Sequence, residues 1–403
     1  MIVPKQTTKI IQQPFTNDFF KDLQKEIQQT IRENKFYAKL CKEHQFSPKK
    51  EITLDDLESI PFVRTSDFKL SAGTYTKLVR TENLYLWTVS SGTSGDPSVV
   101  GRTKEDIELM FKLWRITFKE FFFYDIVSKV FNFAPASKLM KILARRATHI
   151  KNSQMFLACI NEAYGNEKRN CHYLVKIRPF KTIFKAISTF SKVAVVELDK
   201  NFLIKQLRKR RAEDFIVLGG NALLMYNLMV NYLIPKKITF DLGDQGAVCS
   251  GGGGWEGVKA QVKMAPVNKQ EWIERNYEVY GIKPEHIRDI YGFTESSIGF
   301  GGHWSSKYKD FIMHCPPSAR ILVRDPETLE PVKTGDIGLI EVISPYAVKG
   351  YVGVAVLGDD IVKLLGDNRS TCPECGYKGA HFIVLRRSQT APGRSCASIL
   401  KWV

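Results

Sequence analysis

Apolar side chains recur at helical spacing near the start of the chain. They fall four residues apart, at Phe19, Leu23, Ile27 and Ile31. This spacing predicts a helix over residues 17–44, with Asn17 or Asp18 as its cap. Another helix is predicted to begin at Thr103, because Asp106 stands three residues later, at the capping-box position.

Short runs rich in apolar and β-branched residues alternate with the helices. The predicted strands are 83–89, 192–198, 215–219, 245–250, 320–323 and 337–344. Strands that alternate with helices indicate an α/β fold with largely parallel sheets. Because the stretch after about Pro316 is richer in strands and turns, we predict three parts. They are an N-terminal helical segment over residues 1–50, an α/β body over residues 51–315 and a smaller β-rich subdomain over residues 316–403.

Composition and charge exclude several classes of protein. Apolar residues make up 44% of the 403 residues and charged residues 25%, as in globular proteins. No apolar run is long enough to span a membrane, and the start lacks the apolar core of a secretory signal, so we expect a cytoplasmic protein. The net charge of +17 favours anionic partners. No nucleic-acid motif accompanies that charge, so no specific nucleic-acid partner is expected, and the basic run Lys205–Arg211 is interpreted as a solvated helix face.

A loop rich in serine and glycine follows the predicted strand at 83–89. It reads SSGTSGDPS and begins with Ser90, Ser91, Gly92, Thr93, Ser94 and Gly95. Glycines let backbone N–H groups turn toward an anion, and hydroxyls add further donors. The loop has no lysine of the P-loop kind. Its composition therefore leaves two interpretations open, a phosphate-binding loop and an ordinary surface turn.

A run of glycines and two charged residues offer further contacts to a ligand. Gly251, Gly252 and Gly253 follow a predicted strand, which indicates either close approach to a bound molecule or a flexible loop. Asp360 has the chemistry to accept ribose hydroxyls, and Arg387 has the charge to contact phosphate. Either residue taken alone would more often lie in a turn or on the surface.

The segment DIYGFTES combines three kinds of functional group in eight residues. Its candidate residues are Tyr291, Gly292, Thr294 and Glu295. An aromatic ring stacks on a base, a hydroxyl binds phosphate, and a carboxylate holds Mg²⁺. The segment alone only suggests a nucleotide site.

A C-P-E-C sequence near the end of the chain suggests a metal site. The candidate zinc ligands are His314, Cys315, Cys372 and Cys375, with His381 as another candidate for the fourth position. A plain β-turn with free thiols is the alternative. Eight cysteines in a chain of this length do not indicate a disulfide framework. The remaining histidines, His303 among them, are interpreted as surface or satisfied core residues.

Taken together, these segments resemble the acyl-protein synthetase family of the adenylate-forming (acyl/aryl ligase) superfamily. The resemblance rests on SSGTSGDPS, GGGGWEG, YGFTES and CPECGYKGAHFIVLRR, and it runs from about Ile52 to Cys396. It implies the layered α/β domain of adenylate-forming enzymes with a smaller β-rich subdomain. Because the chain ends 16 residues after Arg387, we expect it to lack the C-terminal lid that most of the superfamily carries.

The resemblance also implies a two-step reaction. Family members adenylate a carboxylic acid, here expected to be a fatty acid, with ATP and Mg²⁺, and then pass the acyl group to a cysteine of the enzyme. By position, the Ser90–Ser98 loop would hold the terminal phosphates, Glu295 the Mg²⁺ and Cys396 the acyl group. Further contacts to the nucleotide would come from Tyr291, Thr294, Asp360, Arg387 and Gly251–Gly254. An acyl-acceptor protein, either a reductase or a carrier, is the expected partner.

Two departures from the wider superfamily keep alternatives open. Ser98 stands where most members carry lysine, and Glu256 stands where a basic residue is expected. One alternative is an acyl- or aryl-CoA ligase of the phenylacetate–CoA ligase type. The other is a non-catalytic, nucleotide-binding relative.

Overall fold

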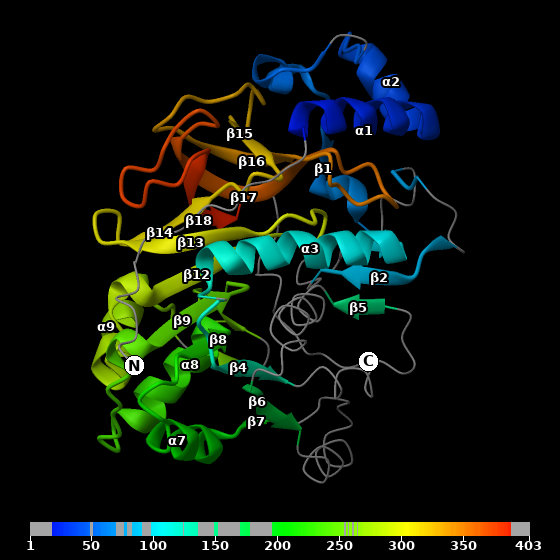
Figure 1. The fold of residues 1–403 in the computed structure, drawn as a ribbon. Helices are drawn as coiled ribbons and strands as arrows, with labels where there is room; N and C mark the ends of the chain where they lie inside the picture. Colours follow the sequence, from blue (N-terminus) through cyan, green and yellow to red (C-terminus); the bar gives the residue numbers. More distant parts are fainter. Residues whose placement is uncertain are drawn as a thin grey trace.

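Strands dominate the part of the chain that the computed structural model describes (Figure 1). The described residues are 18–48, 51–69, 76–78, 83–90, 98–123, 125–135, 149–151, 170–177, 196–253, 255–256, 258–259, 262–263 and 265–387. The helices are α1 (Phe19–Glu33), α2 (Lys35–Glu43), α3 (Lys104–Phe121), α7 (Lys200–Arg208), α8 (Ala222–Leu228) and α9 (Lys269–Tyr280). The strands are β1 (Val63–Arg64), β2 (Leu86–Val89), β3 (Val99–Arg102), β4 (Lys129–Pro135), β5 (His149–Lys151), β6 (Asn170–Ile177), β7 (Val196–Leu198), β8 (Ile216–Gly220), β9 (Gly246–Gly251), β10 (Val258–Lys259), β11 (Val262–Lys263), β12 (Ile287–Tyr291), β13 (Phe300–Ser305), β14 (Asp310–His314), β15 (Arg320–Arg324), β16 (Ile337–Ile343), β17 (Ala355–Gly366) and β18 (His381–Arg387).

Most of these strands belong to one 13-stranded sheet, in the order β15-β16-β17-β18-β14-β13-β12-β9-β8-β4-β6-β7, with β1 beside β17. Strands β6, β4, β8, β9 and β12 pair in parallel, and their intervening segments include α7, α8 and α9. From β12 to β15 every pairing along the sheet is antiparallel. The prediction of an α/β fold is therefore confirmed, with the run of parallel strands at one end of the sheet and a short parallel pair, β1 with β17, at the other.

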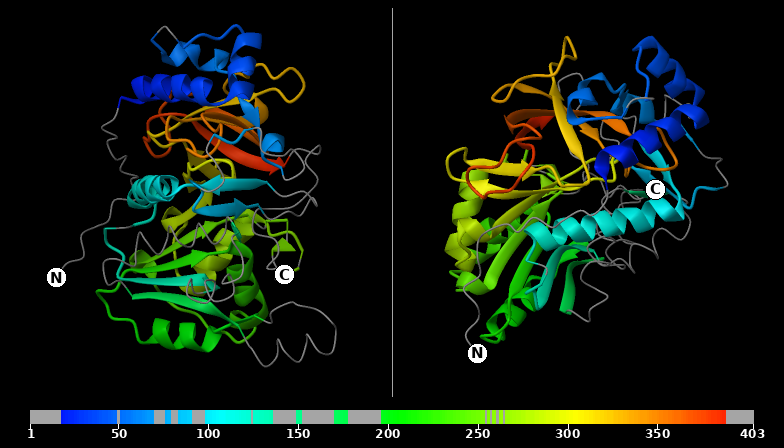
Figure 2. Two further views of the ribbon diagram at one scale, coloured as in Figure 1. Left: turned by 90° about the vertical axis from the view of Figure 1, so that its right-hand side faces the viewer. Right: turned by 45° about the horizontal axis from the view of Figure 1, so that its top comes forward.

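The strands that follow Pro316 are joined to the rest through β14 and β18. Met313 pairs with Phe382, and His314 with His381, so the hydrogen-bonded sheet is continuous across the predicted boundary at residue 315. Figure 2 shows the β15–β18 region stacked above the parallel strands, with α3 crossing between them. The division into parts at residues 50 and 315 stays a prediction, although no gap in strand pairing marks the second boundary.

Helix α3 begins where the sequence places it and packs closely on the sheet. The Asp106 N–H donates to the Thr103 hydroxyl over 3.2 Å, and the Thr103 N–H donates to the Asp106 carboxylate over 2.8 Å, which confirms the capping box. On β13, a Cβ at Gly301 would lie 2.4 Å from the ring of Phe121, so only glycine lets this aromatic side chain of α3 approach the strand.

The predicted helix over residues 17–44 is in fact two helices. Asn34 ends α1 in an extended conformation, and its side-chain oxygen accepts a hydrogen bond from the Tyr37 N–H over 2.8 Å. Asparagine at this position therefore caps a new helix, α2, rather than continuing the first. The series of apolar residues four apart ends at Ile31, because Lys35 occupies the next position, and apolar residues resume at Phe36 and Tyr37 in α2. Both helices lie against the β15–β17 end of the molecule (Figure 1).

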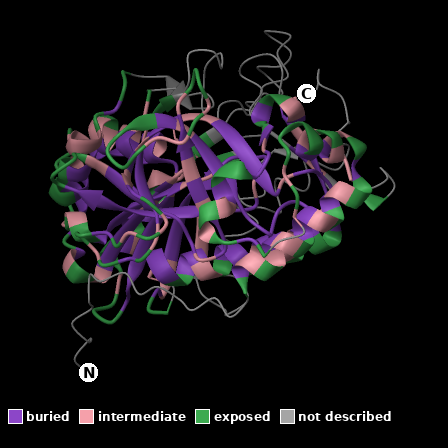
Figure 3. Ribbon diagram, turned by 90° about the horizontal axis from the view of Figure 1, so that it is seen from above, coloured by how far each residue is buried: buried purple, intermediate pink, exposed green. Residues whose placement is uncertain are grey.

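The burial of residues differs between the large sheet and the helices that pack on it. Figure 3 shows the strands of the large sheet mostly buried, while the helices alternate between buried and exposed residues. The basic run Lys205–Arg211 has only Leu207 buried; it forms the solvated last turn of α7 and the three residues that follow the helix. Among the described helices, none has both the length and the apolar character needed to cross a bilayer.

Candidate active site

The parallel strands β8, β9 and β12 end side by side, and the candidate residues follow their carboxyl ends. Gly251, the last residue of β9, pairs with Ile290 of β12, next to Tyr291. Gly252 and Gly253 continue from β9 with φ of 77° and 67°, the left-handed region that favours glycine. The glycine run therefore lies beside the aromatic residue of YGFTES. In open α/β sheets, ligands bind in crevices at this end of parallel strands.

Tyr291 lies at the junction between the parallel and antiparallel strands. Its ring packs on Phe300 of β13 and Phe382 of β18, with centroids 5.7 and 5.9 Å apart. Its hydroxyl donates a hydrogen bond to the Asp360 carboxylate on β17 over 2.8 Å. These contacts bring together two residues that are 69 positions apart in the sequence and that we predicted for one nucleotide site.

Asp360 also pairs in the sheet with Arg387 on β18. The backbones of these two predicted residues therefore lie side by side, while the Arg387 side chain is outside the described residues. The neighbour of Asp360, Asp359, accepts a hydrogen bond from the Thr65 hydroxyl. This contact connects the β17 end of the site to the segment that follows β1.

The serine- and glycine-rich loop is closed at its base by two hydrogen bonds. The Ser90 N–H donates to the Ser98 carbonyl over 2.9 Å, and the Ser98 N–H donates to the Ser90 hydroxyl over 2.8 Å. The loop residues Ser91, Gly92, Thr93, Ser94 and Gly95 lie outside the described residues. The two ends nevertheless fix where the loop leaves and rejoins the fold.

Ser98 lies with Thr294 and Glu295 in a buried cluster of oxygen atoms. All three residues are at most 4% exposed. The Thr294 hydroxyl has no hydrogen-bond partner among the described residues, whereas the Ser98 hydroxyl hydrogen-bonds with the Glu295 carboxylate. Burial raises the pKa of the Glu295 carboxyl, while the neighbouring Ser98 and Lys69 act in the opposite direction. An unpartnered buried hydroxyl beside a buried carboxylate indicates a site that a polar ligand completes.

Arg102 on β3 connects this cluster to the strands that carry the loop. Its guanidinium is fully buried and donates to the Thr88 hydroxyl over 3.1 Å, to the Ser297 hydroxyl over 3.0 Å and to the Thr294 carbonyl over 2.8 Å. One side chain therefore ties the β2–β3 hairpin to the YGFTES segment. We had not predicted this residue, because a single arginine after a strand carries no distinguishing signal.

We expect Arg102→Leu to lower the free energy of unfolding by about 3 kcal/mol, because several buried groups lose a charged partner at once. Urea denaturation followed by tryptophan fluorescence measures the change. Arg208→Leu, at an exposed position on α7, is the matched control and should change stability by less than about 0.5 kcal/mol. Equal effects of the two substitutions would show that the Arg102 bonds contribute nothing specific.

A second cluster contains three of the four predicted zinc ligands. His314, Cys372 and Cys375 lie together with His303, and their potential ligand atoms are all within 4.8 Å of one another. Cys315 is not part of the cluster, which corrects our predicted ligand set. Adjacent residues of an extended chain point in opposite directions, and the Cys315 sulfur instead lies 3.8 Å from the Pro316 carbonyl oxygen.

His303, which we interpreted as a surface or satisfied core residue, takes the place of Cys315. It lies on β13, and its imidazole faces that of His314 on β14. Burial lowers the pKa of His303 to about 3 and also lowers the pKa of His314. No sequence motif marks this residue, because strand register, rather than a short motif, brings it to the cluster. His381 is also separate, with Nδ1 at 3.2 Å from the Gly379 carbonyl oxygen.

Lys69 was not predicted for the site, whereas Cys396 was. Lys69 and Ser98 form an isolated β-bridge, and Lys69 contributes positive charge near Glu295. No motif distinguishes Lys69 from the other lysines of this basic chain. Cys396, the predicted acyl-accepting thiol, lies outside the described residues, so its role stays a prediction.

Comparison with known proteins places the fold and the family. The chain is similar to 2-hydroxyisobutyryl-CoA ligase in its postadenylation state, with a TM-score of 0.59 and 15% identity over 91% of this chain and 66% of that one. An open conformation of the same ligase has a TM-score of 0.59 and 16% identity over 91% of this chain and 68% of that one. The chain thus spans about two thirds of the length of these ligases, whose likeness shows the shared fold.

Comparison of sequences identifies the family more specifically than comparison of structures does. Long-chain-fatty-acid–luciferin-component ligase of Aliivibrio fischeri is 25% identical over 352 residues, which are 85% of this chain and 78% of the relative. The family model described as acyl-protein synthetase, LuxE, matches residues 171–402. Since that match extends over more than half of the 403 residues, the chain belongs to the acyl-protein synthetase (LuxE) family.

Proposed function

We propose that this protein joins a carboxylic acid of the fatty-acid class to a thiol, using ATP, in two steps. In the first step a carboxylate oxygen attacks the α-phosphorus of ATP, pyrophosphate leaves, and acyl-AMP forms. In the second step a thiolate attacks the acyl carbonyl, AMP leaves, and a thioester forms. Membership of the family and the similarity to a long-chain fatty acid ligase support this reaction class.

One observation carries the proposal for this chain: the Ser98 end of the serine- and glycine-rich loop meets the buried Thr294–Glu295 pair. The fully buried Thr294 hydroxyl there has no partner among the described residues, and the Ser98 hydroxyl bonds with the buried Glu295 carboxylate. Leaving a buried hydroxyl unsatisfied costs about 1–3 kcal/mol, which a bound polyphosphate would recover through a hydrogen bond. The phosphates of ATP are therefore assigned to this cluster.

The chemistry of the donors also fits Mg²⁺. Glu295 offers carboxylate oxygens, and Ser98 and Thr294 offer hydroxyl oxygens, which are the hard ligands that this ion takes in proteins. When bound, Mg²⁺ would neutralise the negative charge of the polyphosphate. Glu295 is assigned to hold it, while Thr294 and the loop donate hydrogen bonds to phosphate oxygens.

The nucleoside end of ATP is assigned to the neighbouring strands. Asp360 accepts a hydrogen bond from the Tyr291 hydroxyl, and its carboxylate has the chemistry to accept ribose hydroxyls. The Tyr291 ring packs against Phe293, Phe300 and Phe382 and is assigned to lie along adenine or the acyl-adenylate. Gly251–Gly253 border the base and the acyl group, where the absence of side chains allows close approach.

An isotope exchange assay tests the first step. Full-length protein is incubated with ATP, labelled pyrophosphate, Mg²⁺ and one acid at a time from a panel of fatty, aromatic and amino acids. We expect label to enter ATP only with an acid present, and fastest with fatty acids. Absence of exchange with every acid would favour the non-catalytic, nucleotide-binding alternative.

The acceptor is tested by adding coenzyme A to the same mixture. If the acyl group is passed to the enzyme, one equivalent of AMP is released per chain without coenzyme A, and the label is found on protein. AMP release that requires coenzyme A would instead identify the CoA-ligase alternative. A reductase or carrier protein is proposed as the next acceptor, since an enzyme-bound thioester must be consumed before another turnover.

A further inference from the structure

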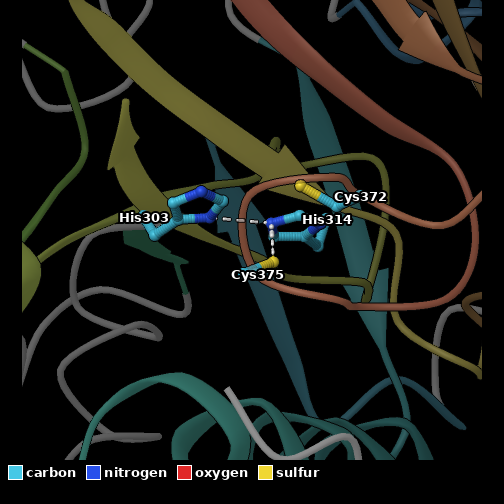
Figure 4. Close-up of side chains that lie close together, drawn as sticks. All are labelled: His303, His314, Cys372 and Cys375. Atoms are coloured by element: carbon cyan, nitrogen blue, oxygen red, sulfur yellow. Dashed lines mark hydrogen bonds between the residues drawn. The ribbon is translucent and has the colours of Figure 1, made fainter. Parts of the chain in front are cut away.

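We propose that two histidines and two cysteines of this chain bind one zinc ion that stabilises the fold. The residues are His303, His314, Cys372 and Cys375, drawn in Figure 4. This site is separate from the proposed nucleotide contacts, and its role is structural. It does not depend on the function proposed above.

The spacing of the side-chain atoms fits tetrahedral coordination. His303 Nδ1 and His314 Nε2 are 2.9 Å apart, and Cys375 Sγ is 3.4 Å from the same His314 nitrogen. All four ligand atoms lie within 4.8 Å of one another. In a zinc site with Zn–N near 2.0 Å and Zn–S near 2.3 Å, ligand atoms are about 3.3–3.8 Å apart. Small side-chain adjustments therefore suffice to bind the ion.

Three separate segments supply the ligands, and the backbone already holds each in place. His303 pairs with Ile312, two residues before His314, so the two histidines lie diagonally on one face of the β13–β14 pair. Cys372 and Cys375 lie in the turn between β17 and β18. There the Gly376 N–H donates to the Cys372 carbonyl over 2.8 Å, with Gly376 at a φ of 76°. This tight turn places both thiols on the same side.

Without a metal, the polar atoms of this cluster are poorly satisfied. His314 is fully buried and His303 is 8% exposed. Their facing nitrogens share one hydrogen bond, while His303 Nε2 and His314 Nδ1 have no hydrogen-bond partner among the described residues. Burying two imidazoles with unsatisfied ring nitrogens beside two thiols costs free energy. Zinc gives each of the four groups a strong bond.

A carboxylate outside the cluster supports the assignment. Glu374 Oε2 lies 3.6 Å from His303 Nε2, the nitrogen that faces away from His314. The Ser305 hydroxyl donates to the other Glu374 oxygen over 2.7 Å and fixes its orientation. Metal-binding histidines commonly present their second ring nitrogen to a carboxylate, which orients the ring and strengthens the ligand. His303 and Glu374 form the same kind of arrangement, with Ser305 orienting the carboxylate.

Four protein ligands leave no position for water or substrate, so the ion would be structural rather than catalytic. It would clamp the β13–β14 hairpin to the β17–β18 turn, across the join where β14 pairs with β18. The strands β13 and β18 also carry Phe300 and Phe382, which pack on Tyr291. The metal would thus fix the strands behind the proposed nucleotide contact.

Metal analysis of full-length protein, purified without a metal-binding tag from zinc-supplemented cells, tests the proposal. We expect roughly one equivalent of zinc per chain, and less than about a fifth of that in Cys375→Ser. Cys315→Ser is the matched control, because Cys315 is a buried neighbour outside the cluster, and it should retain the metal. Chelation of the wild type should lower the unfolding midpoint by about 5 °C or more.

If Cys375→Ser does not fold, a second pair of variants at His303 tests the proposal. His303→Cys keeps a zinc ligand and should retain the metal, whereas His303→Ala should lose it. Less than about a tenth of an equivalent of zinc in the wild type would overturn the proposal. So would zinc retention by both His303 variants, or a disulfide between Cys372 and Cys375 found by mass spectrometry of protein alkylated without reductant.

Discussion

Replacing Glu295 by glutamine is expected to slow acid-dependent pyrophosphate exchange by about a hundredfold to a thousandfold. Glutamine keeps the size of the side chain but removes the negative charge assigned to Mg²⁺. The loss should appear in kcat and in the Mg²⁺ concentration needed for half-maximal exchange. The measurement is the exchange assay with the best acid of the panel, at several Mg²⁺ concentrations.

Stability measurements separate this role from a structural one. Burial raises the pKa of Glu295, which means that the fold does not favour its charged form. The neutral glutamine should therefore leave the unfolding midpoint within about 3 °C of the wild type. Glu327→Gln, in an exposed turn, is the matched control for activity. If Glu295→Gln retained exchange within about threefold, Glu295 would have no part in catalysis.

Cys396→Ser is expected to abolish acyl labelling of the protein while leaving pyrophosphate exchange intact. A serine hydroxyl is almost never ionised at neutral pH, so it cannot replace a thiolate as the nucleophile. Protein incubated with labelled fatty acid, ATP and Mg²⁺ should carry hydroxylamine-labile label in the wild type. The variant should carry less than about a fiftieth of that label, because only the second step is lost.

The described cysteines offer a suitable control for this experiment. Burial raises the pKa of Cys41 to about 11 and of Cys315 to about 12, so neither forms a thiolate readily. Cys41→Ser should therefore keep full labelling. Mass spectrometry of the labelled peptide locates the acyl group directly. A label on any cysteine other than Cys396 would show that we have assigned the wrong nucleophile.

Local signals in the sequence were sufficient for much of the architecture. Thr103 and Asp106 form the predicted capping box because the interaction spans only three residues. The strands around 216–220, 246–251 and 337–343 agree with their predicted ranges to within one residue at each end, since their apolar runs are bounded by turns or glycine. Tyr291, the first residue of the YGFTES segment, is the last residue of β12.

Contacts between distant segments were the part that sequence reasoning did not reach. The pairing of β14 with β18 continues the sheet across the predicted boundary at residue 315, and no local pattern encodes that register. The register of β13 against β14 brings His303, rather than Cys315, to the cluster with His314. Lys69 approaches Glu295 only because its segment forms a bridge to Ser98. Each of these features depends on which strands meet, which composition and periodicity leave undetermined.

The join between β14 and β18 consists of two residue pairs, which makes it a narrow place in a wide sheet. Were it to open, both strands would present rows of unpaired N–H and C=O groups, the template on which foreign chains add and aggregate. Withdrawal of the proposed metal would remove the clamp beside this point. Preparations kept in strong chelators would consequently be the ones most prone to self-association and precipitation.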